Sequence, residues 1–174
     1  MVTPPRRIVV TGSESTGKTT LASRLAERFD TVATPEFSRD YAVERRVPLD
    51  RHDVEAIAVG QIASEDRWAA HARHGLLVLD TDLFSTVVYA PHYYGMLEPW
   101  IEQVALERRG ALYLLLDIDV PWVADPIRDR GNQRREMHAL FRGMLERYAL
   151  PFVTIGGSWD ERLERAVSAV EAPM

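Results

Sequence analysis

Short apolar runs recur along the chain and predict buried β-strands. The runs lie at residues 6–11, 76–80, 111–119 and 151–157, with a shorter one at 31–34. Each run is almost continuously apolar, whereas a half-exposed strand would alternate apolar and polar residues. We therefore expect a sheet that is covered on both faces.

The segments between these runs show helical spacing of apolar residues. Residues 17–29 predict a helix directly after the first strand, and residues 50–74 predict one long helix that stops at His74-Gly75. Residues 160–172 predict an amphipathic C-terminal helix. Strands that alternate with helices favour right-handed crossovers, a parallel sheet and a three-layer α/β architecture.

Composition narrows the class of protein. We expect a single domain over residues 1–174, because no repeat, low-complexity stretch or linker divides the chain, and 46% hydrophobic with 27% charged residues is typical of globular proteins. A net charge of −5 argues against nucleic acid or an anionic membrane as partner. With no cysteine in the chain, disulfides and thiolate metal sites are excluded.

The N-terminal apolar run is too short for a signal peptide or a membrane span, so we expect a cytoplasmic protein. Whether the protein forms a homo-oligomer stays open.

The stretch "GSESTGKTT" matches the pattern G-x-x-x-x-G-K-[ST] between a predicted strand and a predicted helix. Such a loop turns successive backbone N–H groups toward phosphate oxygens at a helix N-terminus. The pattern predicts that the loop binds ATP. Lys18 should contact the β- and γ-phosphates, and the Thr19 hydroxyl should coordinate Mg²⁺. The predicted phosphate-binding residues are Gly12, Glu14, Ser15, Thr16, Gly17, Lys18, Thr19 and Thr20.

Lys18 is the single lysine of a chain that has twenty arginines. A compact ammonium fits a tight phosphate cradle, whereas a planar guanidinium is larger and prefers a bidentate fork. The guanine-recognition sequence N/T-K-x-D of common GTPases needs a second lysine, so that class is excluded. We therefore expect the shape of Lys18, as well as its charge, to matter.

Acidic residues follow two of the predicted strands. Asp80 ends a central strand and should hold Mg²⁺ together with Thr19, while Asp82 points to the same side and either contacts substrate or caps the following helix. Glu36 follows the second strand and should accept the proton of a substrate hydroxyl, with Arg39 as a substrate contact. Surface ion pairing is the alternative for both, and which of the three acids is the base stays open.

The segment "DPIRDRGNQRR" gathers arginines around a glycine and predicts a lid over about residues 120–136. Arg128 and Arg130 are its predicted catalytic arginines, and Arg134 and Arg135 belong to the same group. A solvated helix face is the alternative interpretation.

Aromatic residues offer flat surfaces for a heterocycle. Tyr89 and Tyr94 are the predicted substrate contacts, and Tyr93, Trp100 and Trp122 stand near them in the sequence. Packing in the core is the alternative for each.

Together these segments resemble the kinase domain of NadR-type proteins, the bacterial nicotinamide riboside kinases of the P-loop nucleoside and nucleotide kinase group. The matching segments are "GSESTGKTTL", "PEFSRDY", Gly60-Gln61, "LDTD", "YYG", "DVPWVADPIRDRG" and "GGSWDERLERAV". The resemblance implies a sheet of order 2-3-1-4-5 and ATP-dependent phosphorylation of the ribose 5′-hydroxyl of nicotinamide riboside. It also implies the roles given above for Glu36, Asp80, Asp82, Arg128 and Arg130, and adenine near "GGSWDER".

Two other functions stay open at this stage. A kinase for another nucleoside, a nucleoside monophosphate or a vitamin-like alcohol would have the same fold and loop. A nucleotide-dependent regulatory ATPase would have no acceptor at all. The chain has neither a DNA-binding domain nor an H-x-G-H segment, so neither repression nor dinucleotide synthesis is expected.

Overall fold

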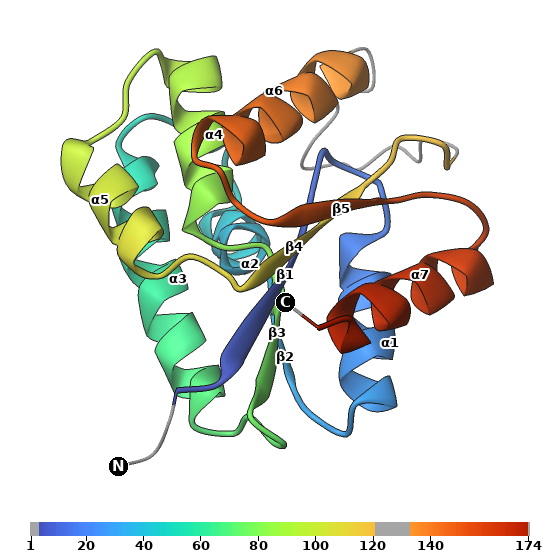
Figure 1. Cartoon of the computed structure of the whole chain (residues 1–174). Helices are drawn as coiled ribbons and strands as arrows, with labels where there is room; N and C mark the ends of the chain where they lie inside the picture. The colour runs from blue at the N-terminus through green and yellow to red at the C-terminus, as the bar shows by residue number, and fades with distance from the viewer. Residues whose placement is uncertain (1–3, 121–132, 174) are drawn as a thin grey trace.

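A five-stranded parallel sheet forms the centre of the molecule (Figure 1). The computed structural model describes residues 4–120 and 133–173. The strands lie in the order β2-β3-β1-β4-β5, which confirms the predicted order. Their bounds are β1 (Arg6–Thr11), β2 (Ala33–Thr34), β3 (Leu76–Asp80), β4 (Leu112–Leu116) and β5 (Phe152–Ile155).

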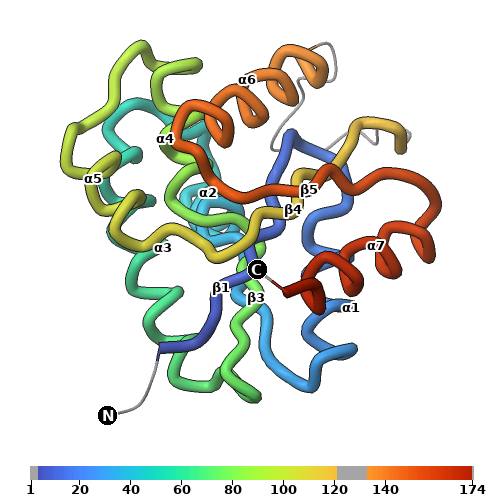
Figure 2. The backbone as a smooth tube through the Cα atoms, viewed as in Figure 1, coloured from blue at the N-terminus to red at the C-terminus, as the bar shows by residue number. Residues whose placement is uncertain are grey.

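Helices cover both faces of this sheet. On one face α1 (Lys18–Arg28) and α7 (Trp159–Glu171) lie side by side, as the trace in Figure 2 also shows. The other face carries α3 (Asp53–Ala69), α4 (Leu83–Tyr94), α5 (Pro99–Glu107) and α6 (Arg134–Arg147), with α2 (Phe37–Arg45) packed against α3. Within residues 4–120 and 133–173, no helix is both long and apolar enough to cross a membrane.

Alternate side chains of each strand enter two separate cores. Ile8 and Val10 pack toward α1 and α7, whereas Val9 packs toward the opposite helices together with Leu77 and Leu79. All five side chains are fully or almost fully buried. This burial on both faces explains why the strand segments read as continuous apolar runs.

The predicted long helix over residues 50–74 is shorter in the structure. It begins only at Asp53, whose carboxylate accepts a hydrogen bond from the Asp50 N–H at 2.9 Å. It ends at Ala69, because the chain must turn back into β3 through His74 and Gly75, which have φ of 52° and 67°. The prediction of a stop at His74-Gly75 is therefore right for the turn but too late for the helix end.

Helix α5 was not predicted, and the start of α6 was predicted only as the alternative to a lid. Helix α5 begins with Pro99 at its first turn, and α6 begins at Arg134, inside the segment predicted as a lid. Residues 121–132 of that lid, which include Arg128, Arg130 and Trp122, lie outside the described residues.

Candidate functional site

The loop between β1 and α1 has the backbone shape that its glycines predict. Gly12 and Gly17 have φ of 134° and 88°, in a region of backbone conformation that residues other than glycine rarely adopt. A Cβ atom on Gly17 would also lie 2.3 Å from the ring of Trp159, at the start of α7. Both the turn and the close approach of α7 therefore require glycine at this position.

Lys18 is buried at the base of this loop, with 6% of its surface exposed. Its Nζ donates to the carbonyl oxygen of Ser13 at 2.8 Å, and the Thr16 hydroxyl donates to the same oxygen at 2.9 Å. The ammonium is thus fixed at the loop where the phosphates are predicted to bind.

Thr19 and Asp80 meet beside the loop. The Thr19 hydroxyl donates to Oδ2 of Asp80 at 2.6 Å, which joins the first turn of α1 to the end of β3. Hard oxygen ligands suit Mg²⁺, which usually keeps several ligands from phosphates and water. No group of three or more acidic or histidine side chains that could hold a metal occurs in the described part of the chain. The pair therefore fits a magnesium ion that a bound nucleotide helps to coordinate.

Glu36 follows β2 and stands at the N-cap of α2, with 8% of its surface exposed. Its Oε1 lies 3.4 Å from the Ser38 hydroxyl. Because β2, β3 and β1 are neighbouring parallel strands, Glu36, Asp80 and the phosphate loop share one edge of the sheet. Arg39 is exposed on α2.

Asp82 is a buried helix cap. Its Oδ1 accepts the N–H of Phe84 at 3.0 Å, and its Oδ2 accepts the Tyr113 hydroxyl at 2.8 Å. Burial, together with the nearby charge of Glu65, raises the pKa of Asp82 to about 7. These contacts match the helix-cap alternative, and a substrate contact by Asp82 stays a prediction.

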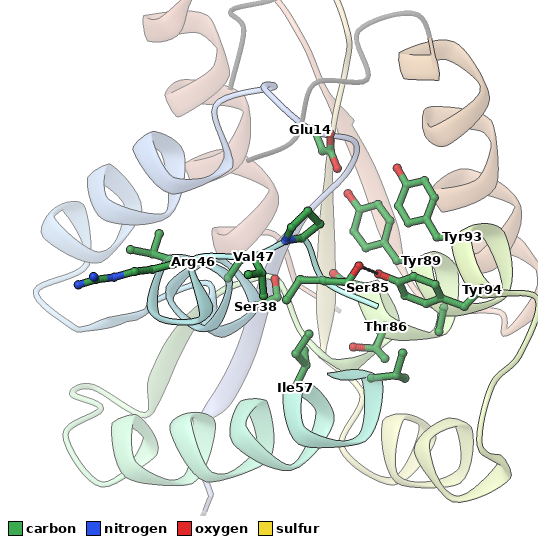
Figure 3. Close-up of a pocket in the computed structure, with 16 residues that line it drawn as sticks. Glu14, Ser38, Arg46, Val47, Ile57, Ser85, Thr86, Tyr89, Tyr93 and Tyr94 are labelled. Carbon is green, nitrogen blue, oxygen red and sulfur yellow. Dashed lines mark hydrogen bonds between the residues drawn. The ribbon is translucent and has the colours of Figure 1, made fainter. Parts of the chain in front are cut away.

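A cavity of about 560 Å³ opens next to the phosphate loop, between α2, α3 and α4 (Figure 3). The predicted residues Tyr89 and Tyr94 line it, while Glu36, Arg39 and Asp82 do not belong to its described lining. The rings of Tyr89 and Tyr93 stack at 5.7 Å with an angle of 6°, which makes one aromatic wall. The full lining comprises Glu14, Ser38, Ala42, Val43, Arg46, Val47, Pro48, Leu49, Val54, Ile57, Ser85, Thr86, Tyr89, Ala90, Tyr93 and Tyr94.

Glu14 belongs to both parts of the site. It lies within the phosphate loop, yet Figure 3 shows its side chain at one end of the cavity, near Tyr89 and Tyr93. The remaining predicted loop residues, Ser15 and Thr20, contribute differently: the Ser15 carbonyl is bound by an arginine of α6, and Thr20 is exposed on α1.

Sequence reasoning missed Arg162, a fully buried arginine of α7. Its guanidinium donates to the carbonyl of Thr16 in the phosphate loop at 3.0 Å and forms an ion pair with Asp119. One signal was available: Arg162, Ala166 and Val170 form the buried stripe of α7 at four-residue spacing. A charged residue in register with an apolar stripe indicates a buried partner.

The chain is similar in sequence to the trifunctional NAD biosynthesis/regulator protein NadR of Escherichia coli (strain K12). The two are 32% identical over 176 residues, which cover 97% of this chain and 43% of the relative. The chain thus spans less than half the length of that relative.

Solved structures of NadR proteins have the same fold. A crystal structure of NadR protein in complex with NR has a TM-score of 0.81 and 27% identity, covering 95% of this chain and 50% of that one. A second, in complex with NAD and AMP-PNP, has a TM-score of 0.80 and 27% identity, covering 95% and 48%. These likenesses confirm the predicted resemblance to NadR-type proteins. A family model described as AAA domain matches residues 7–162, which include the phosphate loop and Asp80, and the chain therefore belongs to this AAA-domain family.

Proposed function

We propose that this chain is an ATP-dependent kinase that phosphorylates the ribose 5′-hydroxyl of nicotinamide riboside. The observation that carries the proposal is the juxtaposition of a phosphate loop, backed by Lys18 and the Thr19–Asp80 pair, with an aromatic cavity that reaches it at Glu14. The similar NadR structures, one in complex with NR and one in complex with NAD and AMP-PNP, support a nucleoside and an ATP-like nucleotide as ligands.

The reaction is a direct transfer between the two sites. The 5′-oxygen of the acceptor attacks the γ-phosphorus of ATP, so a new O–P bond forms while the bond to the β,γ-bridging oxygen breaks and ADP leaves. The hydroxyl proton passes to a carboxylate. Lys18 and the N–H groups of the loop bind the phosphate oxygens on which negative charge is concentrated, and the loop and the cavity hold the reactants in line.

Magnesium fits the oxygens of Thr19 and Asp80, and when bound it would neutralise charge on the β- and γ-phosphates.

Glu36 is the carboxylate that we assign as the base. Asp80 lies with Thr19 at the proposed magnesium position, and Asp82 caps α4 inside the protein, so each of these acids has another role. Glu36 is also buried at the same edge of the sheet. Its carboxylate would orient the 5′-hydroxyl and take its proton.

We assign the side chain of Glu14 to the acceptor rather than to the phosphates. A carboxylate accepts hydrogen bonds and repels phosphate oxygens, so it suits the ribose hydroxyls, which donate. The 5′-hydroxyl must reach the phosphate loop, and the ribose therefore lies at the Glu14 end of the cavity. The nicotinamide ring then lies next to the ribose, against the wall formed by Tyr89 and Tyr93.

The lining favours a nucleoside over a nucleoside monophosphate as acceptor. Arg46 is the one cationic residue in the described lining, and Glu14 gives the reactive end a negative charge. A phosphorylated acceptor needs more positive charge than this. The cationic ring of nicotinamide riboside, in contrast, suits the carboxylate and the faces of the tyrosines.

The test is ADP release with a panel of acceptors at saturating ATP. The panel contains nicotinamide riboside, nicotinic acid riboside, adenosine, cytidine, nicotinamide mononucleotide and a blank, and mass spectrometry locates the new phosphate. We expect the highest kcat/KM with nicotinamide riboside and a product phosphorylated at the 5′-position.

Each rival function has its own outcome in this panel. Preference for another acceptor would change the assigned substrate but leave the assignment as a kinase in place. ADP release that is the same with and without acceptor would overturn the kinase and favour a regulatory ATPase.

A further inference from the structure

Two arginines from different helices contact consecutive carbonyl groups of the phosphate loop. Nη2 of Arg134, the first residue of α6, donates to the Ser15 carbonyl at 3.3 Å. Nη1 of Arg162, in the first turn of α7, donates to the Thr16 carbonyl at 3.0 Å. The two helices lie on opposite faces of the sheet, so the loop is held from both sides.

These contacts determine where the neighbouring N–H groups point. A peptide unit is planar and trans, so its C=O and N–H point in opposite directions. A carbonyl of Ser15 held by Arg134 therefore directs the N–H of Thr16 the other way, and the carbonyl of Thr16 does the same for the N–H of Gly17. Each arginine thus binds the carbonyl side of a peptide unit, and the N–H of the same unit points to the opposite side.

The backbone at this point needs support. Ser15 has φ of 54°, in the left-handed region that is unfavourable for a residue with a side chain. A residue stays in such a conformation only where its surroundings hold it. The contact of Arg134 with the carbonyl of Ser15 supplies one such constraint directly at the strained residue.

Arg162 is itself rigidly held. Besides Thr16 it donates to the carbonyls of Gly157 at 2.9 Å and Asp117 at 3.2 Å, and it pairs with Asp119. Asp119 also accepts the N–H of Gly157 at 2.6 Å. A buried guanidinium is tolerated when its donors are satisfied in this way. The loop is thereby joined to the ends of β4 and β5.

Arg134 has a second anchor on the same side, where its Nη1 donates to the Val120 carbonyl at 3.0 Å. Burial and the neighbouring charge of Arg162 lower its pKa from the ordinary arginine value. The two guanidiniums bind neighbouring carbonyl groups of the loop, and Asp119 offsets the charge of Arg162.

From this geometry we infer that Arg134 and Arg162 are positioning residues that keep the Thr16 and Gly17 N–H groups directed at the nucleotide phosphates. The inference rests on the proposed binding of ATP at this loop and does not depend on the acceptor. Neither arginine needs to touch the nucleotide, because both act through the peptide units of the loop.

The experiment compares the affinity for ADP with that for adenosine, which has no phosphates, in Arg134→Met, Arg162→Met and Arg162→Lys. Arg108→Met is the control, because Arg108 forms ion pairs with Glu65 and Asp66 away from the loop. We expect each methionine variant to weaken ADP binding by about tenfold or more and adenosine binding by less than about twofold. Arg162→Lys should have an intermediate ADP affinity, since lysine keeps the charge but cannot donate to several carbonyl groups as the planar guanidinium does. Arg108→Met should lower Tm but leave ADP affinity unchanged.

Amide hydrogen exchange of the ligand-free proteins supplies the second measurement. Peptides covering residues 12–18 should exchange faster in Arg134→Met, while β1 and β3 stay protected. Equal losses of ADP and adenosine affinity would reduce the arginines to general stabilisers and overturn the inference. Unchanged ADP affinity in a folded variant would overturn it too. If Arg162→Met does not fold, the ADP affinities of Arg134→Met and Arg162→Lys test the inference. A different acceptor preference would not affect this test, because ADP and adenosine affinities are measured without an acceptor.

Discussion

The two halves of the site are built in different ways. On the phosphate side, which comprises residues 12–20 and Asp80, short hydrogen bonds hold Lys18 and Asp80, which are exposed by only 6% and 1%. The acceptor side, which is the cavity between α2, α3 and α4, is apolar, and Val43 and Val47 at its lining are exposed by 55% and 51%. In the proposed reaction, one half binds the triphosphate of ATP, and the other half fits one particular acceptor.

This difference shows where the two kinds of specificity come from. The phosphate side follows from one local stretch of sequence, because backbone N–H groups and a helix N-terminus are sufficient to bind phosphate. The acceptor side exists only after three helices have packed together. Its shape therefore depends on contacts between distant residues, and substitutions there should act on one acceptor and not on ATP.

The largest effect is expected from the phosphate side. Lys18→Ala should lower the rate of phosphoryl transfer by roughly a thousandfold with the fold intact, because one preorganised cation is lost from the transferring phosphoryl group. Lys18→Arg should lower it nearly as far, because the planar guanidinium does not fit the buried position of the ammonium. Single-turnover kinetics measure both, with Tm as the control for folding. An active arginine variant would mean that charge, and not shape, determines this position.

The sequence predicted the phosphate side better than the acceptor side for the same reason. Glycine spacing and short apolar runs are local signals, so the loop and the strands could be predicted from them, whereas the sheet order followed from the resemblance to NadR-type proteins. Helix α6 could not be predicted, because the lid interpretation took its first residue Arg134 as part of a mobile segment. Arg162 was missed because its partners, Thr16 and Asp119, lie far away in the chain. The cavity was predicted only through Tyr89 and Tyr94.

Glu36 lies between the two sides and tests how they meet. Glu36→Gln keeps the size of the side chain but removes the proton acceptor, so kcat should fall on the order of a hundredfold. The KM values for ATP and for the acceptor should change little. Steady-state kinetics with both substrates varied measure this. An unchanged kcat would remove Glu36 as the base and return the assignment to Asp80 or Asp82.

Asp82 is the N-cap of α4, the helix that carries Tyr89 and Tyr94 of the acceptor side. Its pKa of about 7 in the folded protein lies above the ordinary value of 3.8. A raised pKa stabilises the fold below pH 3.8, and this stabilisation is lost as pH rises through 7. Between pH 5 and pH 8, Asp82→Asn should therefore gain about 2 to 3 kcal/mol of stability relative to the wild type.

Denaturant unfolding of both proteins at the two pH values measures this difference. The KM for the acceptor should be unchanged in Asp82→Asn, because the carboxylate oxygens face Phe84 and Tyr113. Parallel pH dependence in the two proteins would show that Asp82 is charged throughout. A raised acceptor KM would restore it as a substrate contact.

The smallest predicted effect isolates the acceptor side through packing alone. Gly60 in α3 lies under the ring of Phe37, and a Cβ atom there would lie 2.0 Å from the ring. Phe37 is the first residue of α2 and follows Glu36 directly. Gly60→Ala should therefore displace the start of α2 together with Glu36 and lower kcat by about fivefold to tenfold, because a small misplacement of a reacting group is costly. The affinity for ADP should not change.

Gly143→Ala is the matched control for this variant. Gly143 also lies within a helix, α6, but a Cβ atom there would meet nothing within 4 Å. Both substitutions raise helix propensity by up to about 1 kcal/mol, so a difference between them reports the contact with Phe37 and not the helix. Phe37→Leu in the Gly60→Ala background should recover part of kcat, since the smaller side chain makes room for the added methyl group. If Gly60→Ala keeps full kcat, the ring of Phe37 adapts, and the position of Glu36 is determined by β2 rather than by the packing of α2 on α3.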